Sequence, residues 1–141
     1  MRTALITTLL ALIAAPALAA PDPVAGEWLT EDGAAKVALA PCEGAPAKLC
    51  GAVIWLRDPV HKPTHDVNNP NPALRGRPLV GLMVIRDMKS AGPGRWTGGK
   101  VYDAESGKTY DGKLRALGAG RLKVEGCVLV VCDSETWTRA N

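Results

Sequence analysis

Residues 95–117, RWTGGKVYDAESGKTYDGKLRAL, predict two β-strands, Arg95–Tyr102 and Thr109–Leu117, joined by a tight turn. Gly107 suits this turn because glycine adopts a positive φ without steric cost, as tight hairpin turns require. The two strands then run antiparallel, and Tyr102 is expected to face Tyr110 across the hairpin as a stabilising pair. The segment therefore predicts a sheet built from hairpins.

The same alternation of short apolar runs and turn residues continues through most of the chain. Gly and Pro recur about every ten residues, and apolar residues rarely follow the helical spacing, which favours a sandwich or a barrel. Closing eight antiparallel strands into a barrel removes the exposed edges of the sheet. We therefore predict an all-β fold, a single antiparallel β-barrel of about eight strands. The other expected strands are Val24–Leu29, Ala35–Ala40, Cys50–Leu56, Leu79–Arg86, Leu122–Val131 and Ser134–Arg139.

One segment, Asp58–Pro78, departs from this rhythm. It contains five prolines, which cannot donate a backbone hydrogen bond to a sheet, and three asparagines lie among them. A loop of roughly 20 residues is uncommon in a compact domain and is often functional. We expect this loop to act as a lid.

The N-terminal residues have the pattern of a cleavable signal peptide. Arg2 supplies a positive charge, the apolar run Ala4–Ala15 follows, and Ala17-Leu18-Ala19 matches the small-x-small cleavage rule. The apolar run is shorter than the about 20 residues that cross a bilayer as a helix. We predict a signal peptide at residues 1–19 and a single barrel domain at residues 20–141, in a periplasmic or secreted protein. The alternative is an N-terminal helix that stays in the fold.

All four cysteines, Cys42, Cys50, Cys127 and Cys132, follow the predicted cleavage site. An even number of cysteines in an exported chain predicts disulfides, although four cysteines allow three pairings. The pairs Cys42–Cys50 and Cys127–Cys132 are favoured because each flanks a short turn-like segment. The alternative is a zinc site, but the spacings differ from Cys-x-x-Cys and export favours oxidation. We therefore expect no metal and no cofactor.

The formal net charge is +3, and basic and acidic residues alternate along the chain. No cluster of lysine and arginine would collect phosphate groups, so the sequence argues against nucleic acid as a partner. The sequence also contains no basic amphipathic helix, which argues against a stable membrane anchor. The remaining partners are a small, partly apolar molecule or another protein.

The two ends of the predicted domain carry matching motifs, Gly26-Glu27-Trp28 on the first strand and Trp137-Thr138-Arg139 on the last. The first and last strands of a closed barrel are neighbours, so Arg139 can lie across the Trp28 ring. Such a cation–π contact contributes about 0.5–2 kcal/mol. The arrangement resembles the Gly-x-Trp motif and terminal arginine of lipocalins, which makes Gly26, Trp28 and Arg139 candidates for barrel closure. The alternative is a core tryptophan and an unrelated surface arginine.

A wider set of motifs spans nearly the whole chain after the predicted signal peptide. They are GEW at 26–28, LCGAVIWL at 49–56, DVNNP at 66–70, LRGRPLVGL at 74–82, WTGG at 96–99, VYD at 101–103, GKTY at 107–110, VEGC at 124–127 and TWTR at 136–139. In order and number they resemble the exported bacterial family known as domain of unknown function 2147. The resemblance implies a lipocalin-like β-barrel and a periplasmic or secreted location, and it brings no established reaction. One departure is Ala104, where Pro is expected, and it affects only the geometry of that turn.

The long loop supplies most of the candidate binding residues. Arg75 and Arg77 can meet an anionic group at the mouth of the barrel, with Asp66 and Asn69 orienting it. The alternative is structural. In that case Asp66 pairs with an arginine, and the asparagine side chains satisfy amides of the loop.

The sequence gives little support for metal binding or catalysis. His61, His65 and Asp66 offer suitable donors for zinc or copper, but Pro63 opposes the helix that would bring the two histidines together. No serine lies in a Gly-x-Ser-x-Gly context, and the cysteines are expected to be oxidised. Catalysis would require at least two titratable side chains, such as His65, Asp66 and Glu105, to converge in a cleft. We therefore predict no catalytic residue.

Three hypotheses for function follow. The first is a small-ligand-binding protein in which the apolar inner faces of the strands hold a partly apolar molecule. Trp55 and Trp96 are the candidate liners of that cavity, and Asp58–Pro78 is the candidate lid. The second is an envelope structural or protein-interaction module with a filled core and an apolar patch on its outside. The third is a secreted hydrolase, which requires convergent titratable side chains.

Overall fold

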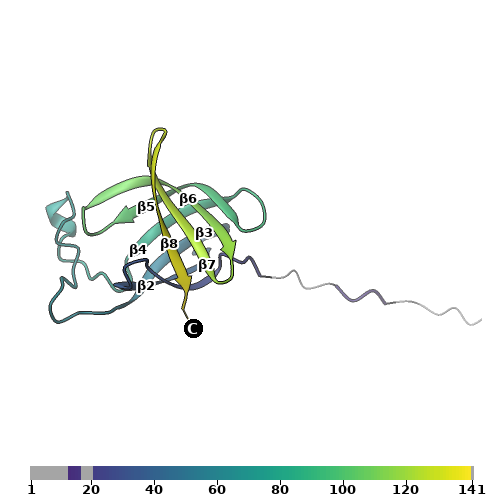
Figure 1. Cartoon of the computed structure of the whole chain (residues 1–141), viewed down its shortest axis with the longest axis horizontal. Coiled ribbons are helices and arrows are strands. Elements are labelled where there is room, and N and C mark those ends of the chain that lie inside the picture. The colour runs from purple at the N-terminus through teal and green to yellow at the C-terminus, as the bar shows by residue number, and fades with distance from the viewer. Residues whose placement is uncertain (1–12, 17–20, 141) are drawn as a thin grey trace, which may run out of the picture.

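A computed structural model of the chain describes residues 13–16 and 21–140 (Figure 1). Most of the predicted signal peptide, residues 1–12 and 17–19, therefore lies outside the described residues, and so does its cleavage site. Within the described part, no helix has the length and apolar character needed to cross a membrane.

Eight antiparallel strands close into one barrel, in which each strand pairs with the next along the chain and β1 pairs with β8. The prediction of an all-β fold with a single barrel of about eight strands is confirmed. Short turns join most neighbours, and the exception is the connection between β3 and β4. The strands are β1 (Gly26–Leu29), β2 (Ala35–Cys42), β3 (Ala45–Leu56), β4 (Met83–Ser90), β5 (Arg95–Asp103), β6 (Lys108–Gly118), β7 (Arg121–Val128) and β8 (Val131–Arg139).

The seam between β1 and β8 closes the barrel through the contact expected from the two end motifs. Trp28 and Arg139 are register partners, and the Arg139 guanidinium carbon lies 4.0 Å from the centroid of the Trp28 ring. The same guanidinium donates to the backbone oxygens of Pro23 and Ala25, at 2.7 and 2.6 Å. A Cβ at Gly26 would lie 2.3 Å from Nη1 of Arg139, so glycine leaves the room that this contact needs. The interpretation of Arg139 as an unrelated surface residue is therefore wrong.

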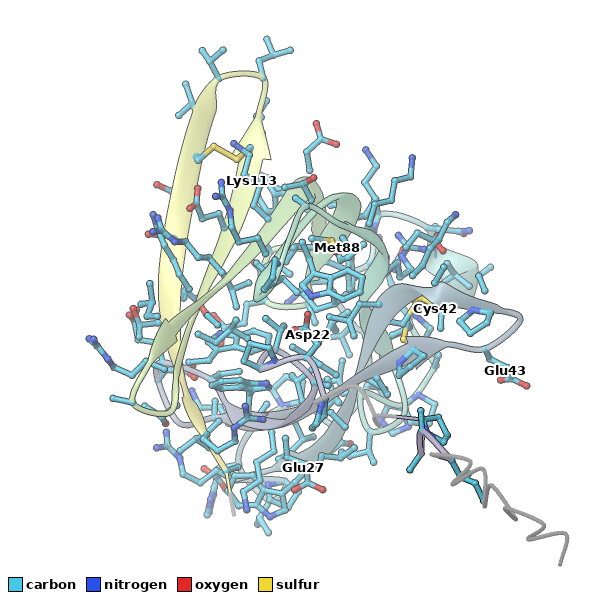
Figure 2. All side chains as sticks on the ribbon, turned by 90° about the vertical axis from the view of Figure 1, so that its right-hand side faces the viewer. Asp22, Glu27, Cys42, Glu43, Met88 and Lys113 are labelled. Carbon is cyan, nitrogen blue, oxygen red and sulfur yellow. A yellow bond between two sulfur atoms is a disulfide. The ribbon has the colours of Figure 1, made fainter. Side chains whose placement is uncertain are left out.

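Large side chains fill the interior of the barrel. The most completely buried include Trp28, Leu39, Ile85, Met88, Leu114 and Leu122. Figure 2 shows Met88 in the middle of the barrel. Two glycines make room for it, because a Cβ at Gly99 would lie 2.4 Å from the Met88 sulfur and one at Gly112 would lie 3.1 Å from it. Methionine is flexible and fills irregular gaps, so this arrangement produces a packed centre.

Several details of the predicted strands are wrong. The strand expected at Leu122–Val131 ends at Val128, and the last strand begins at Val131 instead of Ser134. Tyr102 pairs with Thr109 and not with Tyr110. Because partners share a face and successive residues alternate, the two tyrosines lie on opposite sides of the sheet. The strand expected at Leu79–Arg86 begins later, at Met83, because the residues before it form turns within the preceding loop.

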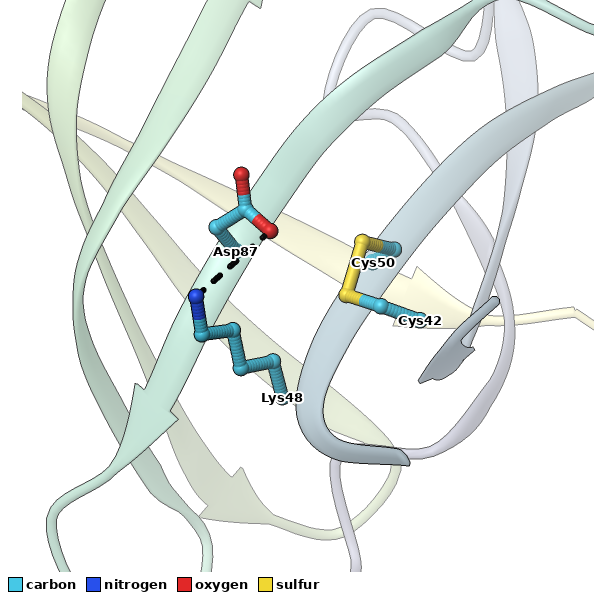
Figure 3. The surroundings of a disulfide bond; sticks show 4 residues. All are labelled: Cys42, Lys48, Cys50 and Asp87. Carbon is cyan, nitrogen blue, oxygen red and sulfur yellow. Dashed lines mark ion pairs between the residues drawn. A yellow bond between two sulfur atoms is a disulfide. The ribbon is translucent and has the colours of Figure 1, made fainter. Parts of the chain in front are cut away.

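The four cysteines form the two disulfides that the sequence favours. Cys42–Cys50 joins β2 to β3, and Cys127–Cys132 joins β7 to β8 at the neck of their hairpin, where the two cysteines are register partners. Figure 3 shows the first disulfide near β4, where Lys48 of β3 lies 4.0 Å from Asp87. No cysteine of the described chain remains as a free thiol, so the zinc alternative loses its thiolate ligands.

Candidate functional site

The long connection between β3 and β4 packs against the turn between β5 and β6. It spans residues 57–82, drawn in teal in Figure 1, and contains one turn of 3₁₀ helix, η1 (Pro72–Leu74). The side-chain amide of Asn68 donates to the backbone oxygen of Glu105 at 2.8 Å. A Cβ at Gly107 would lie 2.0 Å from the Asn68 backbone oxygen, so glycine at this turn also permits the close approach of the loop. The expected long loop is therefore an ordered part of the barrel surface.

A buried carboxylate holds this loop to the barrel. Asp66 is fully buried and accepts hydrogen bonds from the Tyr102 hydroxyl at 2.5 Å, the Asn69 amide at 2.8 Å and Nε of Arg77 at 2.8 Å. Tyr102 belongs to β5, so these bonds join the loop to the barrel wall. The Arg77 guanidinium also lies over the Tyr102 ring, 5.6 Å from its centroid. The negative charge of Asp66 is thus satisfied inside the protein.

These contacts set the ionisation of Asp66 and Tyr102. Burial by itself would raise the pKa of the Asp66 carboxyl, but the hydrogen bonds from Tyr102, Asn69 and Arg77 outweigh it and hold that pKa below its ordinary value. Burial and the hydrogen bond to Asp66 raise the pKa of the Tyr102 hydroxyl. At neutral pH the carboxyl is ionised and the hydroxyl keeps its proton, which is the combination that these hydrogen bonds require.

The predicted binding residues of the loop differ in how many of their polar groups already form hydrogen bonds within the protein. Asp66 pairs with Arg77, as the structural alternative expects. Asn69 and Arg75 are also engaged, since the Asn69 side-chain oxygen accepts from the Asn71 amide and Nε of Arg75 donates to the Asn69 backbone oxygen at 2.8 Å. Arg77 uses Nε for Asp66, and its terminal amino groups form no hydrogen bond within the described residues. Arg77 therefore keeps donors for another partner.

An open groove of about 570 Å³ lies between this loop and strands β4, β5 and β6, and we call it the loop groove. Its volume is within the range of about 300–1,000 Å³ that is usual for small-molecule sites. Polar and apolar groups both line it, so it suits a molecule with both characters. The lining includes Asn69, Arg77, Arg86 and Thr109 as polar residues and Leu74, Val80 and Met83 as apolar ones.

A second open groove, of about 370 Å³, lies where the same loop meets the end of β3. Its lining is mostly apolar and consists of Ile54, Trp55, Leu56, Pro59, Thr64, His65, Pro78 and Val80. The predicted liner Trp55 is 40% exposed there, and the Lys36 ammonium lies 5.2 Å from the centroid of its ring. This groove therefore presents one aromatic face to solvent.

Trp96, the other predicted liner, lies in a different part of the molecule. It is buried in the core, and its Nε1 donates to the Asp22 carboxylate at 3.3 Å. Trp96 lines neither groove, so the structure does not bring it together with Trp55. The centre between the strands, where the first hypothesis expects a ligand, is occupied by Met88 and its neighbours. Space for a ligand is found instead at the surface of the long loop.

The side chains considered for metal binding or hydrolysis do not converge within the described residues. The ring of His61 bonds to Asp58 at 2.9 Å, and that of His65 bonds to the neighbouring threonine hydroxyl at 3.0 Å. Asp66 is occupied by its own donors, and no hydrogen bond of the described chain joins it to the side chains of His65 or Glu105. His65, Asp66 and Glu105 therefore do not form the convergent group that the hydrolase hypothesis requires.

The hairpin of β7 and β8 ends in an exposed apolar surface that the strand pattern did not single out. Val128, Leu129, Val130 and Val131 are 58, 89, 94 and 71% exposed, and we call these four residues the apolar tip. They fill the positions between Cys127 and Cys132, so the disulfide closes the neck of the tip. The unbroken run CVLVVC was the available signal, but apolar runs of this length usually predict a buried strand.

The closed barrel and its Trp28–Arg139 seam define a lipocalin-like β-barrel protein. The family described as "Uncharacterized protein conserved in bacteria (DUF2147)" matches residues 26–139, and the chain belongs to this family. Among solved structures, protein HP1028 from Helicobacter pylori, described as belonging to the lipocalin family, matches with a TM-score of 0.73 and 24% sequence identity. The match covers 86% of this chain and 85% of that chain, and at this identity it establishes the fold alone. Comparison with curated proteins gave no match.

Proposed function

We propose that this protein is an exported binding protein for a small, partly apolar molecule that carries an anionic group. The observation that carries the proposal is the loop groove, whose volume of about 570 Å³ suits such a molecule. The long loop then forms one wall of an outer site instead of a lid over the filled interior. The lipocalin-like fold supports the proposal by analogy only.

The loop groove offers two guanidinium groups together with apolar side chains. Arg86 of β4 forms no ion pair within the described residues, and Arg77 keeps its terminal amino groups beyond the Asp66 contact. A guanidinium binds carboxylate or phosphate oxygens through two parallel hydrogen bonds. Met83 and Val80 provide apolar contact for the rest of the molecule. Asp66 is a positioning residue in this scheme, since it fixes Arg77 without touching the ligand.

Export is part of the proposal. The predicted signal peptide at residues 1–19 and the two disulfides support an oxidising compartment, either the periplasm or the medium. The mature domain then starts at residue 20. Mass spectrometry of the protein recovered from the bacterial envelope and from the medium tests this point, and exported protein that still carries residues 1–19 would contradict it.

Native mass spectrometry of the protein purified from its own bacterial envelope tests ligand binding directly. We expect a bound small molecule that is released when the protein unfolds. If no bound species is found, the titration with octanoate described next decides the proposal.

Isothermal titration calorimetry with octanoate tests the chemistry of the groove. Arg86→Gln should weaken binding at least about tenfold, because a hydrogen bond to a charged group contributes about 1.5–3 kcal/mol. Arg115→Gln is the matched control, since this exposed arginine of β6 does not line the groove, and it should bind like the wild type. Equal affinity in Arg86→Gln and the wild type, or no octanoate binding together with no native ligand, would contradict the proposal.

The second candidate function is the envelope interaction module with a filled core. The specific observations in its favour are the packed interior and the apolar tip. The tip and the loop groove are different surfaces, so the two functions are compatible in one molecule. The hydrolase hypothesis has no comparable support among the described residues.

A further inference from the structure

The apolar tip lies at the end of a hairpin that extends beyond the barrel wall. β1 has four residues and pairs with β8 at two positions, Trp28–Arg139 and Leu29–Thr138. Before that seam, β8 pairs with β7 alone. The β7–β8 hairpin therefore projects from the barrel, and Figure 2 shows it rising above the other strands.

The apolar tip is a compact, uncharged aliphatic surface. Its four side chains are consecutive, all are valine or leucine, and each is more than half exposed. Single exposed apolar residues are common on proteins, whereas a contiguous exposed group marks a contact surface. The Cys127–Cys132 disulfide closes the neck, so the tip loses little conformational freedom when it binds.

We propose that the apolar tip inserts into the interfacial layer of a phospholipid bilayer and holds the protein reversibly on that surface. From the disulfide-linked pair to the turn, the hairpin advances by two residues, or about 7 Å at about 3.4 Å per residue. Interfacial protein segments bury their apolar side about 5–10 Å deep. The first charged side chains on the barrel side of the neck are Glu125 and Asp133. When the tip is inserted, they would lie at the level of the headgroups and water. Such a contact is weaker than a stable membrane anchor.

The charges behind the neck indicate a neutral lipid surface and not an anionic one. Lys123 pairs with Glu125 at 2.8 Å, and Lys100 pairs with Asp111 on the adjoining strands. Paired lysines attract anionic headgroups only weakly, and the exposed Asp133 offsets Lys113, the β6 partner of Glu125. Attachment therefore depends on burial of the aliphatic side chains and only slightly on salt.

A second copy of the chain is the main alternative occupant, because the edge of β8 that β1 leaves uncovered can pair with another strand. In a symmetric antiparallel pair centred on Asp133, that residue would face its own copy, and centring on Ser134 would place Asp133 opposite Glu135. Like charges directly opposite each other destabilise a strand pair. The acidic residues thus disfavour a dimer in these two registers, whereas they remain in water when the tip is inserted.

Co-sedimentation with phosphatidylcholine vesicles tests the proposal, using the protein purified from its bacterial envelope. The wild type should bind, and Val130→Asp should lower the partition constant at least about tenfold, because a charged group would have to leave water with the tip. Val60→Asp is the matched control, since Val60 is 81% exposed in the long loop, and it should bind like the wild type. All three proteins share the same N-terminus, so a difference between them comes from the substituted position.

Insertion of the tip has a separate readout. Leu129→Trp should show a blue-shifted emission on addition of vesicles, and brominated phosphatidylcholine should quench that emission. Near-UV circular dichroism should be unchanged in Val130→Asp and Val60→Asp, because neither side chain packs in the core.

Three results would overturn the proposal: no vesicle binding by the wild type, equal binding by Val130→Asp, or binding that requires anionic lipid and disappears at high salt. A stable dimer in sedimentation velocity that Val130→Asp dissociates would assign the tip to a second copy instead. None of these results bears on octanoate binding, so the loop groove is tested independently.

Discussion

Two arginine–aromatic contacts stabilise the molecule, one at the β1–β8 seam and one that attaches the long loop. They differ in the group that accepts hydrogen bonds from the guanidinium. Arg139 stacks on Trp28 at 4.0 Å and donates to two backbone carbonyls. Arg77 lies 5.6 Å from the centroid of the Tyr102 ring and donates to the buried carboxylate of Asp66. Carbonyls do not titrate, whereas a carboxylate does. The seam is therefore insensitive to pH over a wide range, while the attachment of the loop depends on one ionised group.

Replacing the Asp66 carboxylate should lower the stability more than the other two changes, loss of the Arg139 guanidinium and a change of pH. Asp66→Ala leaves the Tyr102 hydroxyl and the Asn69 amide without their buried acceptor, and we expect the free energy of unfolding to fall by about 2–3 kcal/mol. Urea unfolding followed by tryptophan fluorescence measures it. Asp111→Ala, which removes an exposed ion pair, is the control and should cost less than about 1 kcal/mol. Equal losses in the two variants would mean that the buried network does not hold the loop.

Removing the guanidinium at the seam should have a smaller effect. Arg139→Met keeps an apolar side chain over Trp28 but loses the cation–π contact and both carbonyl bonds, which we expect to cost about 1–2 kcal/mol in thermal unfolding. Arg139→Lys keeps the charge and should recover only part of this loss, because an ammonium does not reproduce the planar guanidinium that donates to both carbonyls. Full recovery with lysine would show that charge alone, and not the geometry of the fork, closes the seam.

A change of pH should weaken the loop network and leave the seam unchanged. Its effect on stability should be the smallest of the three changes. The folded pKa of Asp66 is below its ordinary value of 3.8, so the network contributes its full stability above that value and loses it as the pH falls through the folded pKa. The folded pKa of Tyr102 is above 10.0, so its contribution is present below that value and is lost as the pH rises through the folded pKa. Hydrogen-exchange protection of the loop amides should therefore decrease in acid before that of β1 and β8. Earlier loss of protection at the seam would reverse the comparison.

The seam was predictable because its two partners lie on the end strands. Once eight strands close into a barrel, Trp28 and Arg139 must be on neighbouring strands, whereas the register that makes them partners comes from the structure. The loop network was only half predictable. The sequence shows a carboxylate and two arginines in one loop, but the choice of Arg77 depends on how the loop packs on β5, where Tyr102 lies beside Asp66.

The filled interior and the apolar tip depend on long-range placement, which the sequence pattern does not contain. Met88 occupies the centre because two glycines of other strands, Gly99 and Gly112, lie next to it. A ligand cavity and a packed barrel have the same alternating pattern along each strand. Similarly, CVLVVC has the composition of a buried strand, and only the shortness of β1 leaves this end of the hairpin uncovered.

The bonds from Arg139 to Pro23 and Ala25 also place the two ends of the domain side by side. β8 runs from the apolar tip to this point over nine residues, a length of about 30 Å. A reporter domain fused to either terminus would therefore emerge at the end of the barrel opposite the tip and the long loop. A short linker could join the two termini, which makes this barrel a suitable scaffold for circular permutation.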